Sequence, residues 1–446
     1  MTQNDSIRSL IGFLKKSPTA FHAVEQLRAE LLKNRFTELR ESNAWNLQPG
    51  GRYFTTRNGS SIIAFRVGNA LDGKEGFMIT ASHSDSPCFK IKEKPELRVQ
   101  NSYVQLNTEG YGGMICSTWM DRPLSVAGRV LVRTNCEDGS VRFESRLIDF
   151  DRDLLLIPNV AIHMNRKIND GMTYNKQIDM LPLLATGELK SGAFKEMVAD
   201  QAGAKPEDVL GSDLYLYSRT EPTVWGAENE FVSAGRLDDL ECAWGNLVGF
   251  LNGKNEKRIQ VYCCFDNEEV GSGTKQGAAS TFLADVLYRI VLGLGKNDED
   301  YRCMTARSFM LSCDNAHALH PNHPEKTDAA NRVLMNQGIV IKSHAGQKYT
   351  SDAVSVALFR GICEKAGVPV QFFANRSDEV GGSTLGNIAM SQVSMNTVDL
   401  GLAQLAMHSA YETAGVMDLG YLEQASAAFY STCLTPDENG CLIAEA

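Results

Sequence analysis

The spacing of hydrophobic residues changes twice along the chain. Near the N-terminus, apolar residues recur at helical spacing in AFHAVEQLRAELL, which predicts a helix over residues 20–32. Two short apolar runs follow, SSIIAFRVG and GFMITASHSDSP, and glycine and proline bound them as is typical of buried strands. The first part of the chain therefore predicts helices packed on strands.

From about residue 94 to about residue 230 the pattern consists mostly of short strands and turns, such as GRVLVRTN, VRFESRLIDF and SDLYLYS. Long helical patterns then return between apolar strands, as in DDLECAWGNLVGFL. Strands that alternate with helices favour a mainly parallel sheet. We therefore predict an α/β fold in which a mainly parallel-sheet domain, residues 1–94 and 231–446, is interrupted by a β-rich insertion domain, residues 95–230.

Composition narrows the class of protein. The 446 residues suffice for two domains, and 44 basic against 54 acidic residues give a net charge of −10 without long charged runs. This balance argues against nucleic-acid binding. Neither a signal-peptide pattern nor a long uncharged apolar stretch occurs, so we expect a cytoplasmic protein that does not bind membranes. The 11 cysteines, an odd number without a CxxC pair, favour reduced thiols over disulfides.

Acidic residues and histidines gather where the apolar strands end. The strand RIQVYCCF, for example, runs directly into DNEEVG. The carboxyl ends of parallel strands meet at one edge of a sheet, where α/β proteins bind their ligands. Oxygen and nitrogen ligands of this kind suit a pair of metal ions about 3.5–4 Å apart. The candidates are His83, Asp85, Asp238, Asp239, Glu268, Glu269, Asp314 and His408.

Each candidate also has a purely structural interpretation. An acidic residue at a helix start, such as Asp238, is more often a helix cap, and a single histidine such as His408 is more often a core or surface residue. The adjacent Glu268 and Glu269 carry more weight, because burial of two neighbouring carboxylates without cations costs on the order of several kcal/mol. The combination of candidates, rather than any one of them, predicts the metal site.

Several sequence blocks, taken in chain order, carry a resemblance to a known family. They are SPTAFHAV, TASHSDSPCFKIK, SAGRLDDL, DNEEVGSG, CDNAHALHPNHPEK, GSTLG and QLAMHSAYE. Together they resemble the signature of the aspartyl aminopeptidase family, which includes a vacuolar aminopeptidase. The resemblance implies an α/β metallopeptidase domain, a β-rich insertion that serves in oligomerisation, and a homo-dodecamer. It also implies a metal-dependent aminopeptidase that hydrolyses peptides, with a preference for acidic N-terminal residues.

The resemblance further implies two zinc ions per subunit, for which manganese or cobalt can substitute. Carried over block by block, it implies that His83 and Asp314 bind one ion and that Glu269 and His408 bind the other. Asp238 would bridge both ions.

Four more residues receive implied roles. Asp85 would orient His83, and Glu268 would be the general base that takes a proton from the attacking water. Lys342, in GIVIKSHAGQKYTSDA, stands where the family has a substrate-pocket lysine that favours acidic substrates. His163, in IPNVAIHMNR, stands where the family places a histidine near a neighbouring subunit's active site. From sequence alone, Lys342 could also be an exposed lysine, and His163 a structural residue in an alternating strand.

Some residues depart from the family pattern. Asp239 stands where asparagine is more usual, and NRSDEVGGSTLG, which contains Asp378, differs from the usual RNDSPCGST. These changes leave open a broad or neutral-residue aminopeptidase of the same fold. Two rival classes are a related dinuclear hydrolase, such as a carboxypeptidase or deacylase, and a non-catalytic shell or carrier protein. The lysine-bearing block and the insertion argue against the first class, and the complete set of predicted ligands argues against the second.

Overall fold

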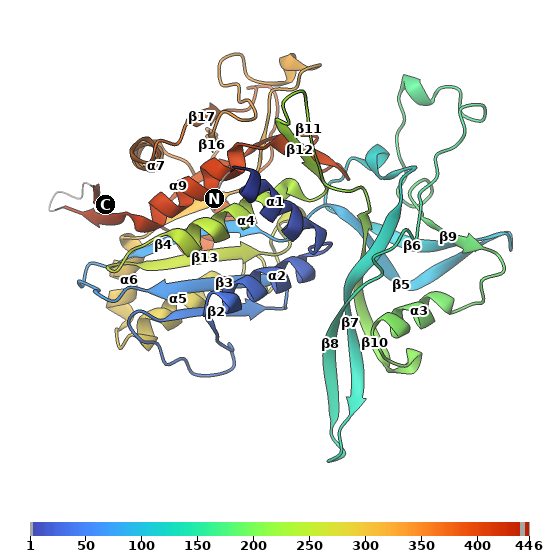
Figure 1. Ribbon diagram of the computed structural model, residues 1–446, viewed down its shortest axis with the longest axis horizontal. Coiled ribbons are helices and arrows are strands. Elements are labelled where there is room, and N and C mark those ends of the chain that lie inside the picture. The colour runs from blue at the N-terminus through green and yellow to red at the C-terminus, as the bar shows by residue number, and fades with distance from the viewer. Residues whose placement is uncertain (1–2, 438–441, 446) are drawn as a thin grey trace.

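A nine-stranded sheet forms the centre of one half of the computed structural model, which describes residues 3–437 and 442–445 (Figure 1). In spatial order its strands are β1 (Thr37–Glu38), β2 (Arg52–Arg57), β3 (Ser61–Val67), β13 (Ile259–Phe265), β4 (Phe77–His83), β14 (Phe309–Cys313), β18 (Asn396–Gly401), β16 (Ile339–Lys342) and β17 (Val370–Phe373). The neighbours β13, β4, β14 and β18 are all parallel, as are the outer pairs β1–β2 and β16–β17. The remaining pairs are antiparallel. The sheet is therefore mixed but mostly parallel, which confirms the predicted α/β class.

Helices cover both faces of this sheet because its central strands are apolar on both sides. All seven residues of β13 are buried, and alternate side chains enter opposite cores. Tyr262 and Cys264 join the core under the first set of helices, whereas Val261 and Cys263 join the core under the second set. The first set is α1 (Gln3–Lys15), α2 (Ala20–Lys33), α4 (Leu237–Asn252), α7 (Ala353–Ala366) and α9 (Asp418–Ser431). The second set is α5 (Phe282–Gly293), α6 (Asp298–Ala306) and α8 (Leu385–Gln392).

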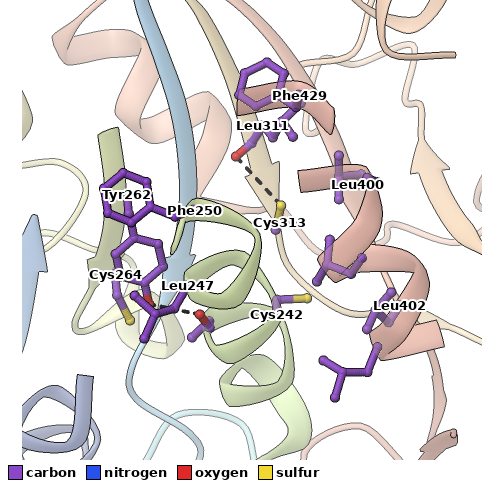
Figure 2. Packing of buried hydrophobic residues seen from close by; sticks show 14 of the residues in the cluster. Cys242, Leu247, Phe250, Tyr262, Cys264, Leu311, Cys313, Leu400, Leu402 and Phe429 are labelled. Atoms are coloured by element: carbon purple, nitrogen blue, oxygen red, sulfur yellow. Dashed lines mark hydrogen bonds between the residues drawn. The ribbon is translucent and has the colours of Figure 1, made fainter. Parts of the chain in front are cut away.

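Figure 2 shows how α4 packs in the first core. Leu247 and Phe250 on this helix lie against Tyr262 and Cys264 of β13, while Cys242 lies toward Cys313 of β14. The Tyr262 hydroxyl donates to the Ala243 carbonyl at 3.0 Å, so the one polar atom of this ring is satisfied inside the core. The packing fixes the position of α4, whose first turn carries Asp238.

A small five-stranded sheet lies beside the carboxyl edge of the large one. Its order is β11 (Thr223–Trp225), β12 (Phe231–Ala234), β20 (Glu412–Gly415), β19 (Ala403–Leu405) and β15 (Ala316–His317). β15 follows β14 almost directly, and β12 leads into α4. The antiparallel pair β19–β20 is joined by residues 406–411. The β14–β15, β12–α4 and β19–β20 connections therefore all lie at the carboxyl edge of the nine-stranded sheet.

A six-stranded antiparallel sheet forms the other half of the molecule (Figure 1). Its order is β8 (Val141–Asp149), β7 (Leu124–Asn135), β10 (Val209–Ser218), β5 (Cys88–Val99), β6 (Tyr103–Tyr111) and β9 (Leu183–Thr186). It has its own apolar core, which includes Phe89, Leu216 and Phe194 of α3 (Ala193–Gln201). The β7–β8 hairpin extends well beyond that core (Figure 1). The sheet occupies residues 88–218. The first predicted domain boundary, at residue 94, therefore falls inside β5. Strand β11 lies within the predicted insertion, but it pairs with the five-stranded sheet.

Residues 158–182 form a long excursion from the six-stranded sheet (Figure 1). Turns and the short 3-10 helix η2 (Ile168–Asp170) occupy it, and His163 lies in a turn rather than in an alternating strand. Met164 is 83% exposed and Ile178 is 72% exposed. A segment that exposes so much apolar surface has the character of an interaction surface.

Two expectations from composition concern the whole chain. Among the helices of the described residues, none combines the length and the apolar character that crossing a bilayer requires. Cys441 lies outside the described residues, and the other ten cysteines are free thiols. The remaining elements are η1 (Cys116–Trp119), η3 (Pro206–Asp208), η4 (Glu268–Val270), η5 (Pro324–Lys326), and the hairpin of β21 (Cys433–Pro436) and β22 (Leu442–Glu445).

Candidate metal centre

Three neighbouring parallel strands deliver predicted ligands to one edge of the nine-stranded sheet. His83 is the last residue of β4, and Asp314 follows β14 directly. Glu268 and Glu269 lie in η4, just beyond the end of β13. Because β13, β4 and β14 are adjacent and parallel, their carboxyl ends place these side chains together.

Asp238 lies at the centre of this group. It comes from the start of α4, and His408 comes from the connection between β19 and β20. One carboxylate oxygen of Asp238, Oδ1, lies 3.5 Å from Nε2 of His83, and the other, Oδ2, lies 3.3 Å from Nε2 of His408. The Asp238 carboxylate therefore faces one histidine with each oxygen.

The side chains form two ligand groups that share Asp238. His83, Asp238 and Asp314 offer ligand atoms within 4.8 Å of one another, and so do Asp238, Glu269 and His408. Nε2 of His408 lies 3.3 Å from Oε2 of Glu269. His83 also belongs to a third group, with Glu268 and Glu269. Two nitrogen and oxygen donor sets that share one carboxylate suit a pair of divalent cations.

Unpaired buried oxygens show that the donor set fits cations. Asp238 Oδ1 and Glu269 Oε1 are buried and accept no hydrogen bond from the described residues. A buried carboxylate oxygen without a partner is costly, and a metal ion at this position would supply the missing charge. The residues present therefore fit a metal pair.

The protonation equilibria agree with a shortage of positive charge. Burial raises the pKa of Glu268 to about 8, and burial together with repulsion from Asp238 raises the pKa of Glu269 well above its usual value. Asp238 behaves differently: burial acts to raise its pKa, but the imidazoles of His408 and His83 outweigh this and lower it. Burial likewise acts to lower the pKa of His408, but Asp238 raises it to about 9. Without metal ions, the positive charge near this cluster comes from the two histidines and from Lys342, whose ammonium lies 3.7 Å from Asp314.

Asp85 supports the centre in two ways. Its backbone carbonyl accepts a hydrogen bond from Nδ1 of His83 at 3.0 Å, which leaves Nε2 facing the ligand cluster. Its carboxylate lies farther from that ring, with Oδ1 3.5 Å from Nδ1. The carboxylate accepts instead from the backbone amides of Glu268, at 3.1 Å, and Glu269, at 3.2 Å. Asp85 therefore fixes a histidine through its backbone and the Glu268–Glu269 turn through its side chain.

Two further acidic residues act on the backbone of the ligands. The carboxylate of Glu412, in β20, accepts from the amide of Asp238 at 3.1 Å and from the amide of His408 at 2.7 Å. Asp239, which follows a cis peptide bond, accepts from the amide of His83 at 3.0 Å. Burial raises the pKa of Glu412 to about 8 and that of Asp239 well above its usual value. Both residues hold ligand backbones rather than offering themselves as ligands.

Lys342 is buried at the end of β16, with 2% of its surface exposed. Its ammonium donates to the carbonyls of Asp314, at 2.8 Å, and Asn315, at 3.2 Å. It also lies 3.7 Å from Oδ1 of Asp314. Burial acts to lower the pKa of Lys342, but attraction to Asp314 outweighs this and raises it. Lys342 is therefore a buried cation that contacts a predicted metal ligand.

A cleft of about 390 Å³ opens beside His408. The segment Gln404–Met407, which directly precedes His408, forms part of its wall. Basic side chains on other parts of the wall are His317, His320, Lys326 and Arg376. Two of these are paired with acids: Lys326 lies 3.4 Å from Glu379, and Arg376 lies 2.7 Å from Asp378. His317 and His320 form no ion pair with an acidic side chain of the described residues.

His163 is the predicted site residue that the structure does not bring into this cluster. It lies on the exposed excursion of the six-stranded sheet. Sequence reasoning missed the supporting contacts of Glu412 and of Tyr111, which donates to Asp85 at 2.6 Å. Glu412 falls in a quoted block and Tyr111 in none, and a hydrogen bond across 26 residues, or across 174, leaves no signal in local spacing.

Comparisons with known proteins identify the family and the fold. Residues 13–430 match the family model described as aminopeptidase I zinc metalloprotease (M18). A probable M18 family aminopeptidase 2 from Clostridium acetobutylicum is 46% identical over 428 residues, which cover 95% of this chain and 98% of that protein. In the cryo-EM structure of the Ape4 and Nbr1 complex, one chain is 34% identical with a TM-score of 0.92, over 96% of this chain and 86% of that one. The S. cerevisiae mApe1 dodecamer matches with 26% identity and a TM-score of 0.83, over 96% of each chain.

Proposed function

Since the chain belongs to the M18 family of zinc metallo-aminopeptidases, we propose that it removes acidic N-terminal residues from peptides with two metal ions and Glu268 as the general base. The single observation that carries this proposal is the pair of ligand groups that share Asp238. One ion would be held by His83 and Asp314, the other by Glu269 and His408, and Asp238 would contact both. Two zinc ions bound there supply Lewis acidity, which makes water easier to deprotonate and polarises the scissile carbonyl.

Glu268 is the residue best suited to move the proton. It lies beside His83 and Glu269 but is absent from the two groups that share Asp238, so its carboxylate remains available. Its backbone amide is tied to Asp85, which fixes the position from which its side chain acts. A carboxylate in hydrogen-bonding reach of the attacking water takes its proton and then delivers that proton to the leaving amine.

A preference for acidic N-terminal residues is supported by Lys342, a buried cation that contacts the predicted ligand Asp314. Burial and the charge of Lys342 both lower the pKa of His317, so its imidazole is uncharged at neutral pH. His317 itself lines the cleft. A carboxylate on the first substrate residue would be attracted by Lys342 and would accept a hydrogen bond from this imidazole, whereas a neutral side chain would do neither.

The contacts of Lys342 also favour the alternative, a broad or neutral-residue aminopeptidase. Its ammonium already donates to the carbonyls of Asp314 and Asn315, and Lys342 is not among the described residues that line the cleft. A lysine engaged in this way would hold Asp314 in position for the metal. In that case its replacement would harm every substrate alike.

The experiment that separates these functions is Lys342→Leu with paired substrates. We measure kcat/KM for aspartyl and glutamyl substrates against alanyl and leucyl ones, together with the metal content of each variant. If Lys342 pairs with the substrate, the acidic substrates lose about 2–5 kcal/mol of transition-state stabilisation and the neutral ones lose little. Equal losses accompanied by loss of metal would show that Lys342 holds Asp314. Lys365→Leu, on the exposed end of α7, is the matched control.

The same proposal includes the assembly. The similar mApe1 protein of S. cerevisiae is a dodecamer, and we infer a homo-dodecamer for this chain as well. The excursion at residues 158–182 supports the inference, because it exposes Met164 and Ile178. It would carry His163 toward the centre of a neighbouring subunit.

A further inference from the structure

Residues 111–118, which we call the strap, connect the six-stranded sheet to both sides of the ligand cluster. The strap begins at Tyr111, the last residue of β6, and ends within η1. The ligand side chains themselves come from β4, η4, α4 and the two connections at Asp314 and His408. The strap is therefore a part of the other half of the molecule that reaches the centre.

At one end of the strap, Tyr111 completes the hydrogen bonding of Asp85. Its hydroxyl donates to Oδ2 of Asp85 at 2.6 Å and accepts from Nδ2 of Asn267 at 2.8 Å. The same carboxylate receives the backbone amides of Glu268 and Glu269. Tyr111 therefore hydrogen-bonds to Asp85, which binds the backbone of the Glu268–Glu269 turn. It also hydrogen-bonds to Asn267, which directly precedes that turn.

In its middle the strap fixes the ring of His408. The Gly113 carbonyl lies 3.0 Å from Nδ1 of His408, and because a carbonyl can only accept, Nδ1 carries the proton. The other ring nitrogen, Nε2, is then the one that would lose its proton and offer a lone pair to a bound metal ion. The Ile115 amide donates to the His408 carbonyl at 3.0 Å, and the Ala410 amide donates to Thr118 Oγ1 at 2.9 Å. The strap therefore holds the His408 loop through both backbone and side chain.

Between these contacts, Gly112 allows the strap to pass close to Glu269. Its φ of +73° lies in the left-handed region, and a Cβ at this position would lie 3.1 Å from Cβ of Glu269 and 3.4 Å from Cβ of Pro87. Any larger residue would press on a predicted ligand. The close approach explains why the strap needs glycine here.

We propose that the strap is a positioning element through which the six-stranded sheet sets the geometry of the metal ligands, with Tyr111 and Gly112 as its positioning residues. The inference rests on the ligand set of the proposed function. It assigns the six-stranded sheet a second task besides assembly, because a shift of this sheet would move the supports of Glu268, Glu269 and His408 together.

The first test is Tyr111→Phe, which removes the hydroxyl and keeps the ring. Tyr103→Phe is the matched control, because Tyr103 lies on the same strand and is 50% exposed. Zinc affinity is measured by competition with a chelator, and kcat and KM are measured at saturating zinc. We expect Tyr111→Phe to weaken zinc binding by about 10–100-fold, the range for loss of an outer-shell partner. Tyr103→Phe is expected to bind zinc as the unmodified protein does.

The second test is Gly112→Ala, with Gly139→Ala as its control. Gly139 has a similar φ of +83° but open space at its Cβ position, so both variants strain the backbone and only one presses on Glu269. We expect a lower zinc affinity for Gly112→Ala alone. Should Gly112→Ala fail to fold, Tyr111→Phe still decides the matter.

Asp238→Ala, measured alongside, separates failure of the strap from failure of the ligand set. If Asp238→Ala loses zinc while Tyr111→Phe binds it as tightly as Tyr103→Phe does, the strap inference is overturned and the ligand set stands. If Asp238→Ala keeps both ions, the ligand set is overturned, and the strap inference with it. Loss of zinc affinity in Asp238→Ala and in Tyr111→Phe, but not in Tyr103→Phe, supports both.

Discussion

The two large sheets of this protein differ in how they are covered, and the difference matches what each contributes. Strand β4 of the nine-stranded sheet is buried at all seven positions, whereas β8 of the six-stranded sheet is mostly exposed. The first sheet supplies ligands from strand ends that two layers of helices hold in place. The second supplies contacts, through the strap, and exposed surface. A rigid, water-poor frame can hold unscreened charge, while an open sheet is free to meet another molecule.

The test with the largest expected effect removes Asp238, the residue shared by both ligand groups. Asp238→Ala takes a ligand from each ion at once, so we expect loss of both metals and no measurable turnover. Metal content per chain and peptide hydrolysis provide the measurement. Asp138→Ala, in the exposed turn between β7 and β8, is the control, and we expect it to keep both. Full activity in Asp238→Ala would rule out the two-metal centre.

A smaller change separates chemistry from metal binding at the same sheet edge. Glu268→Gln keeps the shape of the side chain but removes the base, so turnover is expected to fall by about 10²–10⁴-fold. Two metals per chain should remain, because Glu268 is outside the two groups that share Asp238. Metal analysis and kcat are measured on the same sample. A variant that loses metal would identify Glu268 as a ligand instead.

Replacement of His163 tests whether the six-stranded sheet contributes to the metal centre of a neighbouring subunit. If this residue reaches a neighbour's centre, His163→Ala should keep its assembly and its metals yet turn over about 10²–10³-fold more slowly, as for loss of one transition-state donor. The defining experiment mixes Glu268→Gln with His163→Ala after dissociation. Reassembly then creates some sites that pair an intact Glu268 with an intact His163, and activity should partly return. Mixed assemblies that remain inactive would contradict a shared site.

The smallest expected effect concerns pH and a buried acid of the helical layers. Burial raises the pKa of Asp418 from 3.8 to about 7. The unfolded chain ionises at the lower value, so this residue costs the folded state stability as pH rises toward 7. Asp418→Asn removes that cost, and its stability relative to the unmodified protein should improve by about 3 kcal/mol between pH 5 and pH 7.

Unfolding temperatures at a series of pH values check this prediction. Asp138→Asn is the control in the open sheet, because Asp138 is fully exposed and serine contacts lower its pKa instead. We expect no gain with rising pH for that variant. A difference between Asp418→Asn and the unmodified protein that stays constant from pH 5 to pH 7 would show that Asp418 is ionised throughout.

Much of the centre could be predicted because its ligands lie next to patterns that are local in sequence. His83 ends an apolar strand, Asp314 and the two glutamates follow one, and such strands are readily recognised from their composition. Apart from the strand around His163, the predicted strands and the helix after Asp238 are present in the structure. The prediction of a strand around His163 was less successful, because alternation in IPNVAIHMNR reflects exposed apolar residues in turns rather than one buried face.

The sequence by itself determined which strands and helices form and which chemical groups stand at their ends, since short-range periodicity and residue type decide both. Only the tertiary structure decided how those groups are held. Glu412 joins the amides of Asp238 and His408, Tyr111 braces Asp85, and Lys342 reaches Asp314. Except for the contact between Glu412 and His408, which are four residues apart, each contact joins residues that are distant along the chain, and sheet order and packing bring them within hydrogen-bonding distance.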